Sequence, residues 1–190
     1  MTTVRVAGVG LTPFGDHGDR AGRDLFAEAA AAAVDDAGVD RGAVDRLDYG
    51  NFMGSRAETQ GHQGPLMAEA AGLDCPATRY ESACASAGVA VKAAVEAIRA
   101  GTAKVVVAGG MERMTCLDTG AVTDALAIAA DELYEVRAGM TFPSAYALMA
   151  RAYFDRFGGD RRDLAHITVK NHANAVPNEY AQYQREISVK

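Results

Sequence analysis

The sequence predicts an α/β fold, in which a parallel-rich sheet is layered between helices on both of its faces. Strand-like and helix-like segments alternate along the first 114 of the 190 residues, as they do in strand–helix–strand units joined by crossovers. Residues 104–108 form a β-branched run typical of a parallel strand that is buried on both faces. Residues 89–100 are apolar except for one polar stripe, which predicts a buried helix beginning at Cys84.

The segments before Cys84 supply the other elements of this core. We expect the first strand over residues 4–9, followed by a helix that Asp24 caps and Gly38 ends. Gly8 and Gly10 do not predict a dinucleotide-binding loop, because no third glycine opens the helix and the loop is too long. The remaining elements are expected at residues 47–52 (strand), 65–71 (helix) and 75–80 (strand).

After Met114 the pattern changes. Residues 115–160 are predicted to be an excursion from the core, with a helix over 124–133 and another from Phe142 to Gly158. Residues 161–190 are predicted to contain a return helix, over about 164–175, which Asp160 caps.

Cys84 is the candidate nucleophile. Free backbone N–H groups and the positive end of the helix dipole favour a thiolate at a helix N-terminus. A thiolate can attack a carbonyl carbon, and the same N–H groups can stabilise the oxyanion that results. The alternative is that Cys84 is only a small buried residue, as unpaired cysteines usually are. Local physics leaves both interpretations open.

Three separated motifs resemble those of the thiolase superfamily. Residues 81–88 (ESACASAG) resemble its nucleophile motif, and residues 109–114 (GGMERM) resemble its second signature. Residues 170–182 resemble the archaeal-type and sterol-carrier-linked acetyl-CoA acetyltransferases in particular. Ala87 stands where the family usually has glycine. The resemblance spans essentially the whole chain but implies the N-terminal part only: an incomplete half of the layered thiolase fold, whose fifth strand would follow Lys190.

The resemblance implies an acyl-CoA C-acyltransferase. Cys84 would take an acyl group as a thioester, and a second acyl-CoA, deprotonated at its α-carbon, would attack that thioester in a Claisen condensation. The reverse reaction is thiolysis of a 3-oxoacyl-CoA. No metal or organic cofactor is implied, because the coenzyme A thioester is the substrate. Two alternatives stay open: a condensing enzyme of the ketoacyl-synthase or hydroxymethylglutaryl-CoA-synthase type, and a truncated non-catalytic subunit that acts through a partner.

Five further residues are candidates for the site. Glu112 and Gly110 follow the strongest strand, and Glu112 either takes part in the chemistry or, as we prefer, binds loop backbone and holds the Cys84 turn. His62 is the first histidine to test as a base, although the family's base lies in the C-terminal half. Met140 and Met149 are expected beside the pantetheine arm, or alternatively in the core. In the family the excursion lies over the active site and helps to bind coenzyme A.

Composition and resemblance together define the expected partners. A net charge of −6 without a basic stripe argues against nucleic acid, and no apolar run approaches the roughly 20 residues of a membrane span. Three cysteines without metal-ligand spacing fit the reducing cytoplasm. The resemblance implies a homodimer through an edge strand at Ala77 to Glu81. It is also compatible with a second subunit that supplies the C-terminal half, and with a small OB-fold/zinc-ribbon partner as in archaeal-type thiolases.

Overall fold

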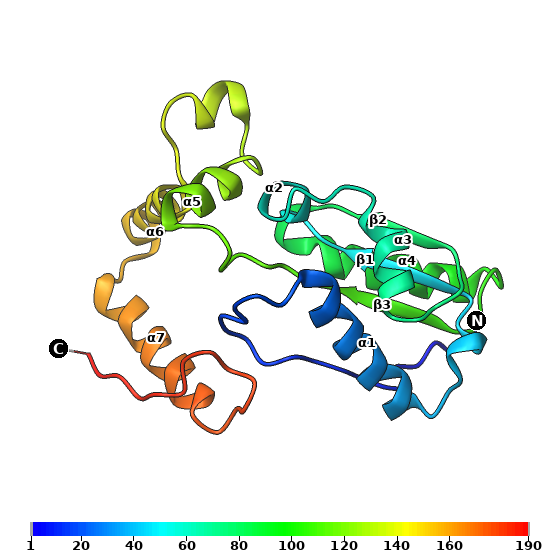
Figure 1. Ribbon diagram of the computed structural model, residues 1–190. Coiled ribbons are helices and arrows are strands. Elements are labelled where there is room, and N and C mark those ends of the chain that lie inside the picture. The colour runs from blue at the N-terminus through cyan, green and yellow to red at the C-terminus, as the bar shows by residue number, and fades with distance from the viewer. Residues whose placement is uncertain (1, 190) are drawn as a thin grey trace. The chain divides into compact units, whose positions relative to one another are not determined.

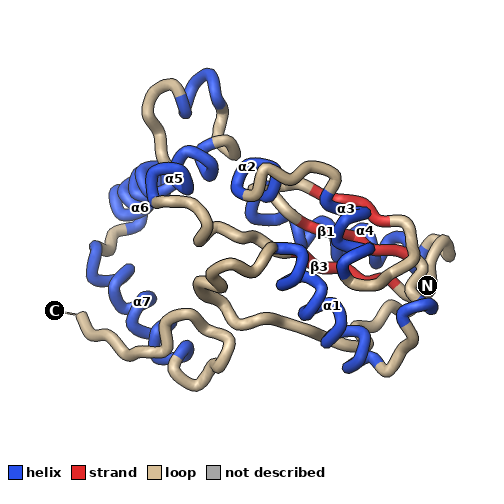
Figure 2. The backbone as a smooth tube through the Cα atoms, viewed as in Figure 1, coloured by secondary structure: helices blue, strands red, loops and turns tan. Residues whose placement is uncertain are grey.

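The computed structural model describes residues 2–189, which form two compact units (Figure 1). The first unit contains the residues up to Thr12 together with His17–Asp118, and the second contains Pro13–Asp16 and the residues from Thr119 onward. All strands of the described residues belong to the first unit (Figure 2). The predicted domain limits at residues 114 and 160 stay predictions.

A three-stranded parallel sheet forms the centre of the first unit. The central strand is β1 (Arg46–Gly50), with β2 (Ala77–Tyr80) on one side and β3 (Val106–Gly110) on the other. The predicted α/β fold with a parallel sheet is therefore confirmed. β2 is an edge strand as predicted, although Glu81 lies beyond its end.

Helices cover both faces of this sheet. α4 (Ser86–Arg99) packs on one face, and α1 (Gly22–Ala37) and α3 (Gln63–Ala70) pack on the other. Side chains of β1 point to the two faces in alternation, so Leu47 and Tyr49 enter the core beneath α1 and α3. The rest of the unit includes the short helix α2 (Gly54–Ala57) and the 3-10 turns η1 (Arg41–Ala43) and η2 (Ala83–Ala85).

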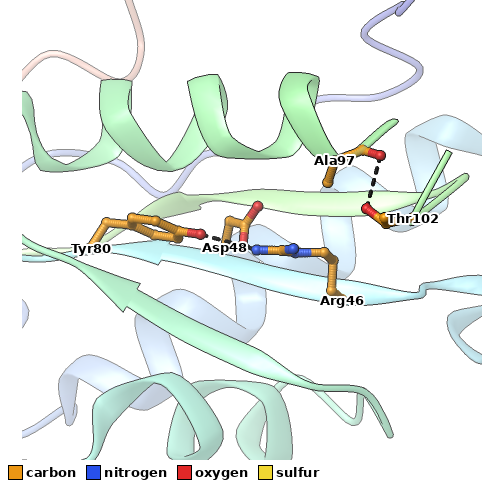
Figure 3. A network of polar contacts seen from close by, with 5 residues as sticks. All are labelled: Arg46, Asp48, Tyr80, Ala97 and Thr102. Carbon is orange, nitrogen blue, oxygen red and sulfur yellow. Dashed lines mark hydrogen bonds and ion pairs between the residues drawn. The ribbon is translucent and has the colours of Figure 1, made fainter. Parts of the chain in front are cut away.

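An ion pair lies on the α4 side of the sheet (Figure 3). Asp48 is fully buried, and its Oδ1 accepts hydrogen bonds from Nε and Nη2 of Arg46 at 3.0 and 2.5 Å. Nη2 of Arg46 also donates to the hydroxyl of Tyr80 at 3.0 Å, which links β1 to β2. The hydrogen bond to Asp48 raises the pKa of Arg46, so the guanidinium stays charged. Oδ2 of Asp48 has no partner among the described residues.

Residues 4–9 do not form the predicted first strand. They lie against α1, where a Cβ on Gly8 would be 2.3 Å from the carbonyl oxygen of Ala33. A Cβ on Gly10 would be 2.0 Å from the carbonyl oxygen of Ala29. The two glycines therefore allow the segment to approach the helix backbone. A β-branched run predicts an extended chain, but it does not show whether a strand or a helix will be its neighbour.

β3 and α4 are also less buried than the sequence predicts. β3 begins at Val106 and is an edge strand whose residues are mostly half-buried, so the prediction of burial on both faces is wrong. α4 begins at Ser86, two residues after Cys84, and Val91 on its outer face is 47% exposed. Because α4 packs on the sheet and on η2, only one face is covered; its buried residues are Ser86, Ala90, Ala94 and Ala97.

The ends of two other helices differ from prediction for local reasons. α1 begins at Gly22, and Asp24 lies in its first turn instead of capping it. Oε1 of Glu58 accepts the amide of Gly22 at 2.9 Å, so a distant side chain satisfies this helix end. Gly38 ends α1 with a left-handed φ of 64°, as predicted. α3 begins at Gln63, two residues before the predicted start.

The second unit is helical: α5 (Thr119–Ala127), the π-helical turn η3 (Glu132–Val136), α6 (Phe142–Phe157) and α7 (Arg161–Ala175). Capping boxes at Thr141 and Asp160 start α6 and α7, close to their predicted positions. The single helix predicted over 124–133 is divided, because the side chain of Asp131 accepts the amides of Leu133 and Tyr134 and begins η3. Within residues 2–189, no helix is both long and apolar enough to cross a membrane.

Candidate functional site

Among the candidate residues of the first unit, Cys84 and Glu112 follow the carboxyl ends of β2 and β3, and Gly110 is the last residue of β3. Since the strands are parallel, these ends lie at one edge of the sheet, where open α/β sheets bind their ligands. Residues 51–55 follow β1, the Cys84 turn follows β2, and residues 111–116 follow β3.

Cys84 lies in the middle of η2, the turn that joins β2 to α4, and its side chain is exposed. The prediction that the helix begins at Cys84 is therefore wrong by two residues, because a 3-10 turn precedes the helix. Ala83, directly before Cys84, has a left-handed φ of 47°, which is uncommon for a residue other than glycine. The backbone thus makes a sharp, strained turn at the cysteine.

Hydrogen bonds within the turn leave one amide free. The amide of Ala83 donates to Oε1 of Glu81 at 2.6 Å, and the amide of Ala85 donates to the carbonyl of Ser82 at 2.9 Å. The amide of Ser82 donates to Oγ of Ser86 at 2.9 Å. Among the described residues, the amide of Cys84 has no hydrogen-bond partner. A free N–H donor therefore sits on the same residue as the exposed thiol.

Two glycines let the backbones around the turn approach one another. A Cβ on Gly50, the last residue of β1, would lie 2.4 Å from the amide nitrogen of Ala87 and 2.6 Å from the carbonyl carbon of Ser86. A Cβ on Gly110 would lie 2.0 Å from the carbonyl oxygen of Gly50. The start of α4 is therefore seated directly on the end of the central strand, and Gly110 provides the space beside it.

Glu112 binds the loop after β1. Its carboxylate accepts hydrogen bonds from the amides of Phe52 and Met53, the latter at 3.1 and 3.2 Å. It makes no hydrogen bond to the Cys84 turn, so the loop that it holds is a different one from the loop we expected. Burial raises the pKa of Glu112, while the two amides and the charge of Arg79 act in the opposite direction.

Arg79 holds the same loop from β2. Its Nε donates to the carbonyl of Asn51 at 3.2 Å, and its Nη2 donates to the carbonyl of Phe52 at 3.0 Å. Asn51 is buried, and its Nδ2 donates to the carbonyl of Met111 at 2.6 Å. These contacts join strand β2 to the loop after β1, and that loop to the segment after β3. We did not single out Arg79 from the sequence, although a charged residue inside a short strand, five residues before Cys84, was a usable signal.

The other candidates are not joined to Cys84 by any contact between described residues. His62 is exposed, has a left-handed φ of 55° and directly precedes α3. Met140 is half-buried and Met149 is 61% exposed, and both belong to the second unit, so their expected role beside a pantetheine arm stays a prediction. In the part of the chain that the structure describes, no group of three or more His, Cys, Asp and Glu residues could hold a metal ion.

Comparison with known proteins identifies relatives along the whole chain. The family model "Thiolase, N-terminal domain" matches residues 4–190. The acetyl-CoA acetyltransferase of Methanothermobacter thermautotrophicus is 40% identical over 190 residues, which are 100% of this chain and 49% of that protein. Human sterol carrier protein 2 is 29% identical over 199 aligned positions, which cover 100% of this chain and 36% of that protein.

A solved structure described as "Ltp2-ChsH2(DUF35) aldolase" has the same fold. It is 29% identical, with a TM-score of 0.68, and the match covers 96% of this chain and 46% of that chain. The chain spans about half the length of the acetyltransferase that it matches.

Proposed function

Because the chain belongs to the thiolase family, we propose that it supplies the acyl-accepting cysteine of an acyl-CoA C-acyltransferase. The family inferred from the three motifs is thereby confirmed, including its archaeal-type and sterol-carrier-linked relatives. The observation that carries the proposal is the Cys84 turn, where an exposed thiol and a free amide lie on one residue at the carboxyl edge of the sheet.

The proposed chemistry begins at the sulfur of Cys84. The thiolate attacks the thioester carbon of an acyl-CoA, and the amide of Cys84 donates to the oxyanion that forms. Collapse of this intermediate breaks the bond to the coenzyme A sulfur, which leaves as a thiolate, and the acyl group stays on Cys84. The α-carbanion of a second acyl-CoA then attacks the acyl carbon, forms the new carbon–carbon bond and releases the cysteine. The same steps in reverse are thiolysis of a 3-oxoacyl-CoA.

Turnover also needs a base for the α-proton and a site for the enolate. By family resemblance these residues lie in the C-terminal half, which we propose to act with this chain as part of the same polypeptide or as a second subunit. The DUF35 component named in the similar aldolase structure supports a further subunit, which we propose to be a small OB-fold/zinc-ribbon protein. We also propose that the protein forms a homodimer through β2, takes acyl-CoA as its substrate and is located in the cytoplasm.

A second candidate reaction is carbon–carbon bond cleavage of the aldolase type. The description of the 29% identical neighbour as an aldolase favours it. A retro-aldol step releases an aldehyde or ketone and an enolate without an acyl-enzyme, so it does not require a nucleophilic thiol. The two reactions are therefore separated by their dependence on Cys84.

Thiolysis of acetoacetyl-CoA tests the proposal. The chain should be assayed alone, mixed with the C-terminal half of the Methanothermobacter acetyltransferase, and fused to that half, with Cys84→Ala as the control in each form. We expect no turnover from the chain alone, because a missing base or oxyanion donor each costs about two to four orders of magnitude in rate. The completed protein should be active, and Cys84→Ala should abolish that activity.

Two results would overturn the proposal. Activity of the completed protein that survives Cys84→Ala would remove the acyl-enzyme and favour the aldolase reaction. Robust turnover by the 190-residue chain alone, lost in Cys84→Ala, would show that one of its own histidines is the base, with His62 the first to replace.

A further inference from the structure

A buried serine is bonded to the turn that carries Cys84. Ser86, the first residue of α4, is only 4% exposed. Its Oγ accepts the amide hydrogen of Ser82 at 2.9 Å and donates its own proton to the carbonyl of Ala83 at 2.7 Å. One hydroxyl therefore links the peptide unit between Glu81 and Ser82 to the peptide unit between Ala83 and Cys84.

Few other contacts hold the shape of the turn, and the one that reaches α4 runs from the backbone amide of Ser86 to the carbonyl of Ala83. Glu81, Ser82, Cys84 and Ala85 are all exposed, so packing does not fix them. Ala83 is held at a φ of 47°, a conformation that costs a residue with a side chain free energy. The bonds from Ala83 to Glu81 and from Ala85 to Ser82 are made within the turn and move with it.

Ser86 differs because its backbone is seated on the sheet. The closest atoms to a Cβ built on Gly50 belong to Ala87 and Ser86, so the start of α4 cannot shift without breaking its contact with the central strand. The hydroxyl of Ser86 therefore connects an exposed turn to a helix start that is packed against the central strand. We infer that Ser86 is a positioning residue, which holds Ala83 in its left-handed conformation and so fixes the thiol and amide of Cys84 in one arrangement.

This inference rests on the proposed role of Cys84, and it differs from a purely structural role for Ser86. Ser82 is exposed and Ala83 half-buried, so water can replace the lost hydroxyl at both groups, and Ser86→Ala should leave the fold intact. The effect should appear instead in the reactivity of Cys84. The matched control is Thr102→Ala, since the hydroxyl of Thr102 donates to the carbonyl of Ala97 at 3.1 Å at the opposite end of α4 (Figure 3).

The test uses the full chain and limiting iodoacetamide. The rate of labelling of Cys84 is divided by that of Cys116, another exposed thiol of the same molecule, and amide hydrogen exchange is followed at Ser82. Ser86→Ala should lower the Cys84/Cys116 ratio by about two- to fivefold, the range that an interaction at a helix end represents. The amide of Ser82 should then exchange faster. Thr102→Ala should change neither quantity, and Ser86→Thr, which keeps a hydroxyl, should restore part of both.

Cys75 reports on folding in the same experiment. Its thiol is half-buried, and burial raises its pKa, so it should stay slow to label while the unit is folded. If Cys75 labels quickly in Ser86→Ala, that variant is not folded, and Ser86→Thr is compared with the native protein instead. In Ser86→Thr, any decrease in the labelling rate of Cys84 must be accompanied by faster hydrogen exchange of the Ser82 amide.

The possible failures are distinct. The first failure concerns Ser86 alone: in folded Ser86→Ala, the ratio of Cys84 to Cys116 labelling rates is unchanged or higher, and hydrogen exchange of the Ser82 amide is unchanged. This result overturns the role of Ser86 and leaves Cys84 as the nucleophile. Labelling of Cys84 that is no faster than that of Cys116 in the native protein counts against the proposed function. The role of Ser86 is then still decided by exchange at Ser82, and unprotected exchange of that amide in the native chain would refute it.

Discussion

Replacing Gly50 by alanine should separate the sheet from the helix that begins beside Cys84. A Cβ at this position would lie 2.4 Å from the amide nitrogen and 2.5 Å from the Cα of Ala87, and 2.6 Å from the carbonyl carbon of Ser86. All three are backbone atoms, so no side-chain rotation can relieve the contact. Either β1 or the start of α4 must move, and the Cys84 turn moves with α4.

Gly109→Ala is the matched control for this change. Gly109 is also a strand glycine, in β3, but a Cβ there has no atom within 4 Å. Gly→Ala at a compatible position stabilises a protein by about 0.4–1 kcal/mol through the unfolded state, whereas overpacking typically costs about 1–3 kcal/mol. Because the collision at Gly50 is with backbone, the free energies of unfolding of the two variants should differ by about 1.5–4 kcal/mol.

Urea unfolding followed by circular dichroism measures this difference, and limiting iodoacetamide measures the effect on Cys84. Gly50→Ala should be the less stable variant and should label Cys84 more slowly relative to Cys116. Equal stability of the two variants, or a native-like labelling pattern in Gly50→Ala, would show that α4 is not seated on β1 in the way described.

Three other predictions concern the first unit. Arg46→Met leaves the buried carboxylate of Asp48 without its partner and should lower the free energy of unfolding, measured in urea, by about 1–3 kcal/mol. This loss is smaller than that expected for breaking a fully buried ion pair, because Arg46 is partly exposed. Tyr80→Phe, which removes one hydrogen bond from the same network, should cost at most about 0.5–1.5 kcal/mol, and equal losses would contradict this account. Burial raises the pKa of Glu112, so the folded state binds that proton more tightly than the unfolded state, and the Glu112 contribution to stability should fall as the pH rises through its titration. Urea midpoints between about pH 4 and 7 should therefore be less pH-dependent in Glu112→Gln, and an unchanged slope would exclude Glu112 as the cause. Finally, the outer edge of β2 should pair with the same edge of a second copy in a symmetric dimer. Light scattering at micromolar concentration measures the oligomeric state, and a monomer with native helicity would contradict this prediction.

The sheet could be predicted from the sequence because its signals are local. Residues 47–52 and 75–80 carry strand and turn signals within their own length, and both form strands close to the expected positions. The order of the strands is a property of long-range pairing, so the β-branched run at β3 did not reveal that it lies at an edge. Residues 4–9 show the same limit, since their glycines serve contact with α1.

The candidate site likewise has parts that the sequence predicts and parts that depend on long-range contacts. Cys84 is identified by its motif and by the turn and helix that follow it, and both signals are local. The contact of Glu112 with the amides of Phe52 and Met53 joins residues about 60 positions apart, and it becomes visible only once β1 and β3 are known to be neighbours. Ser86 had a weak local signal, because serine is favoured at helix starts, but its two bonds depend on the conformation of Ala83.

Protection of Cys84 by acetyl-CoA tests the central claim most directly. The folded chain is incubated with acetyl-CoA at neutral pH, treated with limiting iodoacetamide and mapped by peptide mass spectrometry, with and without hydroxylamine to cleave thioesters. Without acetyl-CoA, Cys84 should be alkylated ahead of Cys116 and of the half-buried Cys75. With acetyl-CoA, Cys84 should carry an acetyl group and escape alkylation until hydroxylamine releases it, while Cys116 is alkylated as before. Acetylation of Cys116 or Cys75 in preference to Cys84, or an unprotected Cys84 in the folded chain, would contradict the assignment of Cys84 as the acyl-accepting nucleophile.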